Sequence, residues 1–180
     1  MAINWFPGHM NKAKREIGKA MGQVRLVIEV LDARIPFSSE NPLVAGLRGD
    51  TPHIKVLNKR DLADAAVTQA WLAHLNARPG ITAVALHREE PAKAKDLISL
   101  GFSLLPADRN PTKPVTAMVL GIPNCGKSTL INTLVGRTIA KASNRPAVTQ
   151  RQERIKVRKD FWLLDTPGFL WPKLSPPECG

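Results

Sequence analysis

Residues 121–128 read Gly-Ile-Pro-Asn-Cys-Gly-Lys-Ser, which fits the phosphate-loop pattern G-x-x-x-x-G-K-[ST]. The preceding residues 115–120 (VTAMVL) form a short apolar run typical of a buried strand, and residues 128–135 have a helical pattern. The glycines allow a tight loop whose backbone N–H groups converge on phosphate oxygens, and the helix N-terminus adds a favourable dipole. A strand-to-helix turn with chance glycines is the alternative, but the motif and both flanks favour a phosphate loop. We then expect Lys127 to reach the β- and γ-phosphates and the Ser128 hydroxyl to bind Mg²⁺.

Short apolar runs bounded by turn residues recur along the chain, with helical patterns between them. Parallel strands are predicted over residues 24–31, 53–57, 81–86 and 115–120, and helices over residues 11–23, 67–77, 92–105 and 128–135. Residues 155–158 and 161–164 are separated only by Lys159-Asp160, which predicts an antiparallel hairpin. Strands that alternate with helices predict an α/β fold with a mostly parallel six-stranded sheet.

The composition is that of a globular protein with a single core. Of the 180 residues 43% are hydrophobic and 23% are charged, and no apolar run approaches the roughly 18 residues that a membrane helix needs. Cys125 and Cys179 have no metal-site spacing, and the first residues are unlike a secretion signal, so the cytoplasm is the expected location. The chain has 26 Lys and Arg against 15 Asp and Glu, and the net charge of +11 suits a polyanion such as nucleic acid.

A second motif, Asn58-Lys59-Arg60-Asp61, follows the predicted strand 53–57, so it is expected at the same carboxyl edge of the sheet as the phosphate loop. Guanine presents two adjacent donors, N1–H and the exocyclic amine, and one carboxylate such as that of Asp61 can accept both. Adenine lacks this pair and would leave a buried carboxylate unpaired. Lys59 is expected to pack its stem along the purine, and Asn58 to tie this loop to the phosphate loop. For the tetrapeptide alone, a charged turn after a strand is the alternative.

The segment Asp165-Thr166-Pro167-Gly168 follows the predicted strand 161–164. An acid that holds Mg²⁺ and a glycine N–H that contacts the γ-phosphate are expected at such a place. Thr149, between the phosphate-loop helix and the hairpin, is a candidate to complete the magnesium coordination, with exposed turn chemistry as its alternative.

Together these motifs resemble the circularly permuted GTPases that assemble ribosomes, of the ribosome biogenesis GTPase A or YlqF type. The base-contacting motif at residues 58–61 precedes the phosphate loop, whereas ordinary GTPases have the reverse order. Residues 4–10 (NWFPGHM), 32–36 (DARIP) and 165–172 (DTPGFLWP) are similar to further signatures of that family. The resemblance spans essentially the whole chain and implies a circularly permuted P-loop GTPase fold with three layers.

The resemblance implies a role for each matching residue. The expected GTP-binding residues are Asn58, Lys59, Arg60, Asp61, Leu86, His87, Asn124, Cys125, Gly126, Lys127, Ser128, Thr129 and Gly168. The expected magnesium ligands are Ser128, Thr149 and Asp165, and Asn124 is expected to help hold a potassium ion beside the phosphates.

Lys127 and His9 are the candidate catalytic residues. Phe169 follows Gly168, so the glutamine that orients water in many GTPases is absent. In this family the histidine of the Pro-Gly-His-Met segment has been proposed for that task, which points to His9. The alternative is that His9 caps the first helix or contacts RNA.

Two loops depart from the family pattern. Leu86-His87-Arg88-Glu89 stands where the second purine-contact loop usually reads Ser-Ala-Lys. Ala147 stands where the loop before Thr149 usually has glycine, which restricts the backbone to ordinary φ values.

The expected organisation is a basic helical segment at residues 1–23, a circularly permuted GTPase domain at 24–172 and a truncated tail at 173–180. Family members continue into a C-terminal helical RNA-binding domain, so a truncated chain is expected to keep nucleotide binding and to couple weakly to the ribosome. Residues 137–159 hold eight Lys or Arg, and the predicted first helix is also basic. These two segments are candidate RNA contacts. The alternative is that both are charged faces that contact only solvent.

The leading interpretation is a monomeric GTP-hydrolysing switch that acts in late assembly of the large ribosomal subunit. Its implied partners are GTP, GDP, the large subunit and ribosomal RNA, and its cofactors are Mg²⁺ and K⁺, with no membrane span. One alternative is a GTP-gated RNA-binding module with negligible hydrolysis. A third interpretation is an ATP-dependent kinase with the same phosphate loop.

Overall fold

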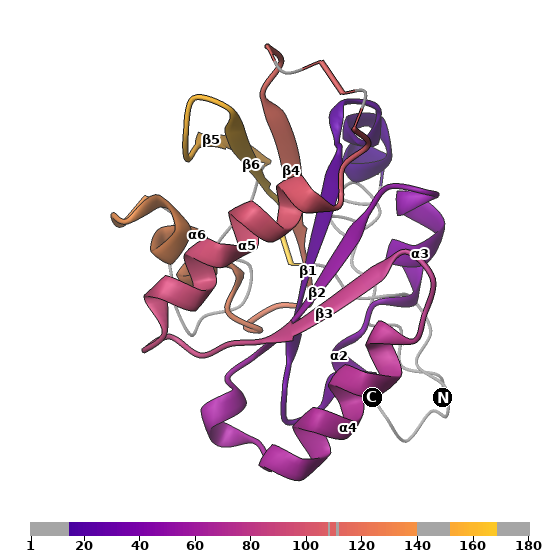
Figure 1. Ribbon diagram of the computed structural model, residues 1–180, viewed down its shortest axis with the longest axis vertical. Coiled ribbons are helices and arrows are strands. Elements are labelled where there is room, and N and C mark those ends of the chain that lie inside the picture. Colours follow the sequence, from indigo (N-terminus) through magenta and orange to yellow (C-terminus); the bar gives the residue numbers. More distant parts are fainter. Residues whose placement is uncertain (1–14, 108, 111, 140–151, 169–180) are drawn as a thin grey trace, which may run out of the picture.

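The computed structural model describes residues 15–107, 109–110, 112–139 and 152–168. They contain a six-stranded sheet in the order β3-β2-β1-β4-β6-β5 (Figure 1). The strands are β1 (Leu26–Asp32), β2 (His53–Asn58), β3 (Ile81–Ala85), β4 (Val115–Leu120), β5 (Glu153–Lys156) and β6 (Phe161–Asp165). Every neighbouring pair is parallel except β5 and β6, which are antiparallel. The predicted α/β class with a mostly parallel sheet is therefore confirmed.

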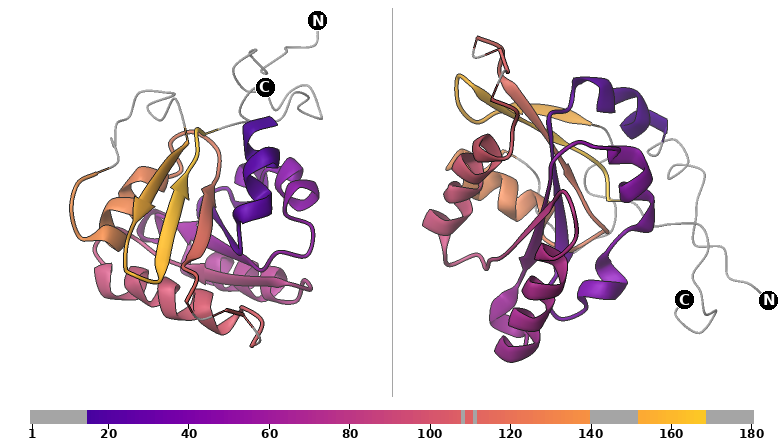
Figure 2. Two further views of the ribbon diagram at one scale, coloured as in Figure 1. Left: turned by 90° about the horizontal axis from the view of Figure 1, so that it is seen from above. Right: turned by 45° about the vertical axis from the view of Figure 1, so that its right-hand side comes forward.

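Helices cover both faces of this sheet and make three layers (Figure 2). The helical elements are residues 15–20, η1 (Met21–Gln23), α2 (Pro36–Ser39), α3 (Pro42–Arg48), η2 (Arg60–Leu62), α4 (Ala65–Asn76), α5 (Pro91–Ser103) and α6 (Lys127–Val135). One face packs against α5 and α6 through the largest apolar cluster, and the other packs against residues 15–20, α3 and α4 through two smaller clusters. Within the described part of the chain, no helix is long and apolar enough to cross a bilayer.

The structure adds two short helices, α2 and α3, that the sequence analysis did not predict. Each has proline at its first position, Pro36 or Pro42, where the missing N–H costs nothing. Asn41 caps α3, because its side-chain oxygen accepts a hydrogen bond from the Leu43 N–H at 3.0 Å. With lengths of four and seven residues, neither helix shows a periodic apolar pattern that a sequence reading could detect.

The edge strand β5 lies two residues earlier than the predicted range 155–158. Ile155 is buried and pairs with Leu163 across the antiparallel ladder, whereas its neighbours on β5 are exposed. The chain then turns over residues 157–160, where the N–H groups of Val157 and Arg158 both donate to the Phe161 carbonyl at 3.1 and 3.0 Å. The predicted two-residue turn at Lys159-Asp160 was therefore wrong, because this wider turn uses four residues.

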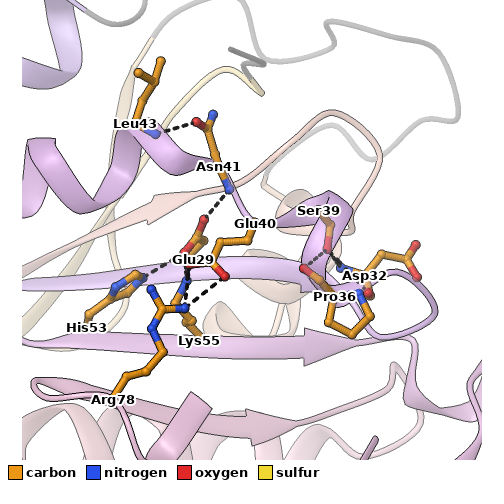
Figure 3. A network of polar contacts seen from close by, with 10 residues as sticks. All are labelled: Glu29, Asp32, Pro36, Ser39, Glu40, Asn41, Leu43, His53, Lys55 and Arg78. Atoms are coloured by element: carbon orange, nitrogen blue, oxygen red, sulfur yellow. Dashed lines mark hydrogen bonds and ion pairs between the residues drawn. The ribbon is translucent and has the colours of Figure 1, made fainter. Parts of the chain in front are cut away.

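Buried charges interrupt the apolar strands β1 and β2 (Figure 3). Glu29 and Lys55 face each other in the register, with 0% and 2% of their side chains exposed, and Lys55 Nζ lies 2.8 Å from Glu29 Oε2. Lys55 Nζ also lies 2.7 Å from Glu40 Oε1, so one cation serves two carboxylates. The backbone N–H of Asn41 donates to Glu29 Oε1 at 3.0 Å, and His53 Nε2 lies 3.1 Å from Glu29 Oε2. We call Glu29, Glu40, His53 and Lys55 the buried ion network.

Burial acts on the charge states within this network. Burial alone would raise the pKa of the Glu29 carboxyl, but the adjacent His53 imidazole and the hydrogen-bonded ammonium of Lys55 hold its pKa below the usual value. Burial lowers the pKa of His53, so its imidazole is neutral at pH 7. The charged pair at the centre of the network is therefore that of Glu29 and Lys55.

Lys55→Met tests how much this network contributes to folding. Because the substitution leaves Glu29 and Glu40 without their shared cation, we expect the free energy of unfolding to fall by about 3 kcal/mol. Arg78→Met is the control, since its guanidinium pairs with Glu40 at 2.9 Å but is 39% exposed. It should lower the free energy of unfolding by less than about 1 kcal/mol. Urea denaturation followed by circular dichroism gives both values, and equal losses would contradict a special role for the buried cation.

Candidate nucleotide-binding site

The carboxyl ends of β1, β2, β4 and β6 meet at one edge of the sheet and place the predicted site residues there. Asp32, the last residue of β1, pairs with Asn58, the last residue of β2, and Asp165 at the end of β6 pairs with Val119 of β4. The segments that follow β2, β4 and β6 carry the three sequence motifs. Motifs that are more than sixty residues apart in the sequence therefore share one rim.

The phosphate loop, residues 121–128, leaves β4 and enters α6 with an unusual backbone. Gly126 caps α6 with φ = 102°, and a Cβ atom at this position would lie 2.2 Å from Asn58 Nδ2. Gly121 passes so close to β1 that a Cβ would lie 2.5 Å from the Val30 carbonyl oxygen. Both glycines of the motif are therefore required by the backbone and its neighbours.

Lys127 begins α6 and is almost fully buried, with 7% of its surface exposed. Its Nζ donates to the carbonyl oxygens of Ile122 at 2.8 Å and Gly121 at 3.2 Å, so the ammonium lies inside the curve of the loop.

The other side chains of the loop differ in their exposure. Cys125 is buried, and burial raises the pKa of its thiol, which keeps it protonated at neutral pH. Asn124 has φ = 62° and is exposed, as is Thr129, whereas Ser128 is half-buried.

Side chains of the base-contacting motif bind the backbone of the phosphate loop. Asn58 Nδ2 donates to the Cys125 carbonyl at 2.9 Å, and Lys59 Nζ donates to the Asn124 carbonyl at 2.8 Å. Asn58 thus ties the two loops together in the way that the sequence analysis anticipates. Asp61 lies in η2 and is exposed to solvent.

The loop after β3 is attached to the base-contacting motif through a residue that the sequence analysis did not single out. Leu86 accepts a hydrogen bond from the Arg60 N–H at 3.1 Å, and the Arg60 side chain makes a two-point contact with Glu90. Glu90 also contacts Lys93 at 2.5 Å and His87 Nε2 at 3.3 Å. Hydrogen bonds from Arg60 and Lys93 lower the pKa of Glu90 to about 2, so it is ionised at neutral pH. Backbone hydrogen bonds thus hold Leu86 beside the motif, and Glu90 links His87 to Arg60.

Residues 165–168 pack against the phosphate loop from the side of β6. Asp165 and Thr166 are buried, and the Thr166 hydroxyl donates to the Val119 carbonyl at 2.7 Å. A Cβ at Gly168 would lie 2.9 Å from backbone atoms of Pro123 and 3.0 Å from Lys127 Nζ. Gly168 therefore lies next to both the loop and its lysine, at a distance that only glycine tolerates without a shift.

The residues at this rim suit Mg²⁺ as a metal partner. Ser128 offers a hydroxyl and Asp165 a carboxylate, and Mg²⁺ prefers oxygen ligands. Among the described residues no three His, Cys, Asp or Glu side chains cluster as an all-protein metal cage. The predicted residues His9, Thr149 and Phe169 lie outside the described residues.

Comparisons with known proteins agree with this geometry. A family model described as a 50S ribosome-binding GTPase matches residues 116–178. Ribosome biogenesis GTPase A of Bacillus licheniformis is 44% identical over 97% of this chain and 64% of its own length, and that of Priestia megaterium is 45% identical over 100% of this chain and 65% of its own. The crystal structure of GNP-bound YlqF from T. maritima superposes with a TM-score of 0.66 and 28% identity, over 93% of this chain and 62% of that one.

The chain belongs to the ribosome biogenesis GTPase A family. The fold is that of a circularly permuted P-loop GTPase, because the motif at residues 58–61 precedes the phosphate loop and yet lies beside it. The chain spans about two thirds of the length of these relatives, 64% of the Bacillus licheniformis protein and 65% of the Priestia megaterium protein. YjeQ from Thermotoga maritima, at 19% identity and a TM-score of 0.53, shares the fold.

Gly126→Ala tests whether the loop geometry depends on the missing side chain. Gly136 is a matched control, because it also has positive φ, 76°, but a Cβ added there would meet no atom within 4 Å. We expect Gly136→Ala to lower the free energy of unfolding by about 1 kcal/mol through backbone strain alone, and Gly126→Ala by about 3 kcal/mol, since Asn58 must also leave Cys125. Urea denaturation of both variants measures the difference, and equal losses would refute the close contact with Asn58.

Proposed function

We propose that this chain binds GTP at the carboxyl edge of its sheet and hydrolyses it as a switch in late assembly of the large ribosomal subunit. The observation that carries the proposal is the pair of hydrogen bonds from Asn58 and Lys59 to the backbone of the phosphate loop, at 2.9 and 2.8 Å. These bonds hold a base-contacting loop and a phosphate-binding loop beside each other, as a nucleotide requires. The names of the relatives, as ribosome biogenesis GTPases, support the biological context.

In this proposal the base lies between the two loops that follow β2 and β3. The exposed carboxylate of Asp61 accepts the two donors of guanine, and the stem of Lys59 packs along the purine. Arg60, Leu86 and His87 complete the base side of the site, with Arg60 held by Glu90.

The phosphates bind the backbone N–H groups of residues 124–129 at the start of α6. Lys127 turns its ammonium from the loop carbonyls to the β- and γ-phosphates, and Gly168 donates its N–H to the γ-phosphate. Ser128, Asp165 and Thr149 would hold Mg²⁺, and Asn124 would help hold K⁺. Bound there, these cations supply positive charge to the phosphate oxygens.

Hydrolysis forms a bond between a water oxygen and the γ-phosphorus while the bond from that phosphorus to the bridging oxygen of GDP breaks. The products are GDP and inorganic phosphate. Lys127 stabilises the charge that develops on the transferred group, and His9 positions the water, because Phe169 has no polar atom for that role.

The proposed GTPase domain is residues 24–172, preceded by the basic segment 1–23. The net charge of +11 supports ribosomal RNA as the partner. In this proposal the chain acts in the cytoplasm as a monomer. Because phosphate neutralisation releases counterions, its RNA affinity is expected to fall steeply with salt.

Asp61→Asn tests guanine recognition. An amide cannot accept both guanine donors, but its NH₂ group can donate to the carbonyl that xanthine has in place of the guanine amine. We expect calorimetry to give GTP binding weaker by about 100-fold, with xanthosine triphosphate bound better than by the wild type. Asp64→Asn is the control, since Asp64 caps α4 by accepting from Val67 and asparagine caps equally well. Unchanged GTP affinity in Asp61→Asn, or wild-type preference for ATP, would refute the guanine site.

Single-turnover hydrolysis tests the enzymatic part of the proposal. We expect the wild-type chain to convert GTP to GDP, with only weak stimulation by large-subunit precursors, and His9→Ala to lower the hydrolysis rate at least about tenfold if His9 positions water. GTP binding should change little in His9→Ala. Binding without hydrolysis in the wild type, with or without precursors, would instead favour the GTP-gated RNA-binding module.

A further inference from the structure

Asp32 ends β1 in a position that is fixed from both sides. Its backbone N–H donates to the Ser39 hydroxyl at 3.0 Å, and the next N–H, that of Ala33, donates to the Asn58 carbonyl at 2.8 Å. The residue is 4% exposed, and its carboxylate points away from the Glu29–Lys55 pair (Figure 3). This backbone clamp leaves the carboxylate in a preset place at the nucleotide rim.

The Asp32 carboxylate accepts hydrogen bonds from two cations. Oδ2 accepts from Lys59 Nζ at 2.9 Å and from Arg34 Nη2 at 2.7 Å, and Oδ1 accepts from the Arg34 Nε at 2.9 Å and the Arg34 N–H at 3.1 Å. Burial opposes ionisation, but Arg34 and Lys59 together hold the pKa of Asp32 well below its usual range. The carboxylate is therefore charged under all physiological conditions.

Lys59 depends on this carboxylate for its position. Its backbone has φ = 60°, which turns the chain sharply at the end of β2, and its Nζ makes two contacts, one to Asp32 and one to the Asn124 carbonyl at 2.8 Å. The Asn124 carbonyl is neutral, so Asp32 is the charged partner that holds the ammonium against the phosphate loop. The ends of β1 and β2 and the phosphate loop are thus joined at one nitrogen atom.

We propose that Asp32 is a positioning residue for guanine nucleotide binding, which it promotes by holding Lys59 against the carbonyl of Asn124. The bridge from Asp32 through Lys59 to Asn124 sets the distance between the base-contacting loop and the phosphate loop before the nucleotide arrives. A preset distance strengthens binding because the two loops lose less conformational entropy when the nucleotide binds. This inference rests on the proposed binding of guanine nucleotides.

Asp32→Asn is a sharp test because it keeps the size of the side chain. Both carboxylate oxygens accept hydrogen bonds, and an amide replaces one of them with an NH₂ donor that faces a donor of Arg34 or Lys59. The negative charge is also lost. We expect the affinity for GDP that carries a fluorescent methylanthraniloyl group to fall by about 10- to 100-fold.

Arg34→Gln is the matched control, because Arg34 pairs with the same carboxylate but is 48% exposed and does not contact Lys59 or the phosphate loop in any hydrogen bond of the described residues. We expect its affinity for the same GDP probe to stay within about threefold of the wild type. A loss in Arg34→Gln as large as that in Asp32→Asn would overturn the proposal, since Asp32 would then act by ordering the Arg34 turn.

A double-mutant cycle separates positioning from general stability. If Asp32 acts through Lys59, the variant with both Asp32→Asn and Lys59→Met binds the probe within about threefold of Lys59→Met alone. Losses that simply multiply would overturn the proposal. Lys59→Met also tests the bridge without altering the buried carboxylate, and affinity within about threefold of the wild type would overturn it as well.

Thermal unfolding without nucleotide completes the experiment. The melting temperature of Asp32→Asn should lie within a few degrees of that of Arg34→Gln. If Asp32→Asn does not fold, Asp32 stabilises the fold as a whole rather than the position of the loop, and the proposal is refuted. Failure of the proposed function is visible separately, because the wild-type chain would then not bind the GDP probe at all. In that case both proposals fall, whereas tight wild-type binding with an unaffected Asp32→Asn removes only the role of Asp32.

Discussion

Two hydrogen bonds from the end of β2 to the backbone of the phosphate loop determine the geometry of the site. Asn58 donates to the Cys125 carbonyl and Lys59 to the Asn124 carbonyl, across 67 and 65 residues of sequence. Because the acceptors are backbone carbonyls, the bonds fix the path of the loop itself and not the orientation of a side chain. Gly126 makes the bond from Asn58 possible, since any Cβ there would occupy the place of the Asn58 amide. Base-contacting and phosphate-binding loops are therefore held in one arrangement by contacts within the protein.

The parallel sheet explains why the permuted order of the motifs leaves this arrangement intact. β1 lies between β2 and β4 and is parallel to both, so the ends of all three strands reach the same edge whichever strand comes first in the chain. The connection from β2 to β4 runs through η2, α4, β3 and α5. Permutation changes which strand ends are joined by loops, and the entropy cost of closing a loop grows only slowly with its length. The strand pairs and the rim hydrogen bonds do not require one particular order of the strands in the chain.

The parts of the fold that could be predicted are those that local sequence encodes. The run at residues 115–120 was predicted as a strand and is β4 to the residue, and the phosphate loop after it is a contiguous motif. The role of Asp32 as a partner of Lys59 could not be predicted, because it arises from pairing of β1 with β2 across 27 residues, and the same holds for Glu90 and Arg60 across 30 residues. β5 was misplaced because its only buried residue is Ile155, which gives no alternation to read. The roles predicted for His9 and Thr149 stay predictions.

The buried ion network is better explained by the direction it gives to the segment between α2 and α3 than by a contribution to the stability of the fold. On the sheet face that bears Glu29 and Lys55, it lies between one apolar cluster around Val27 and Val44 and another around Leu31 and Leu57. Apolar side chains of similar volume would fill this space at lower desolvation cost. They would not bond the Asn41 N–H or Glu40, which hold the segment between α2 and α3 in one direction. Ser39, the last residue of α2, adjoins that segment and accepts a hydrogen bond from the backbone N–H of Asp32. The buried charges therefore also help to fix the residue that holds Lys59 at the rim.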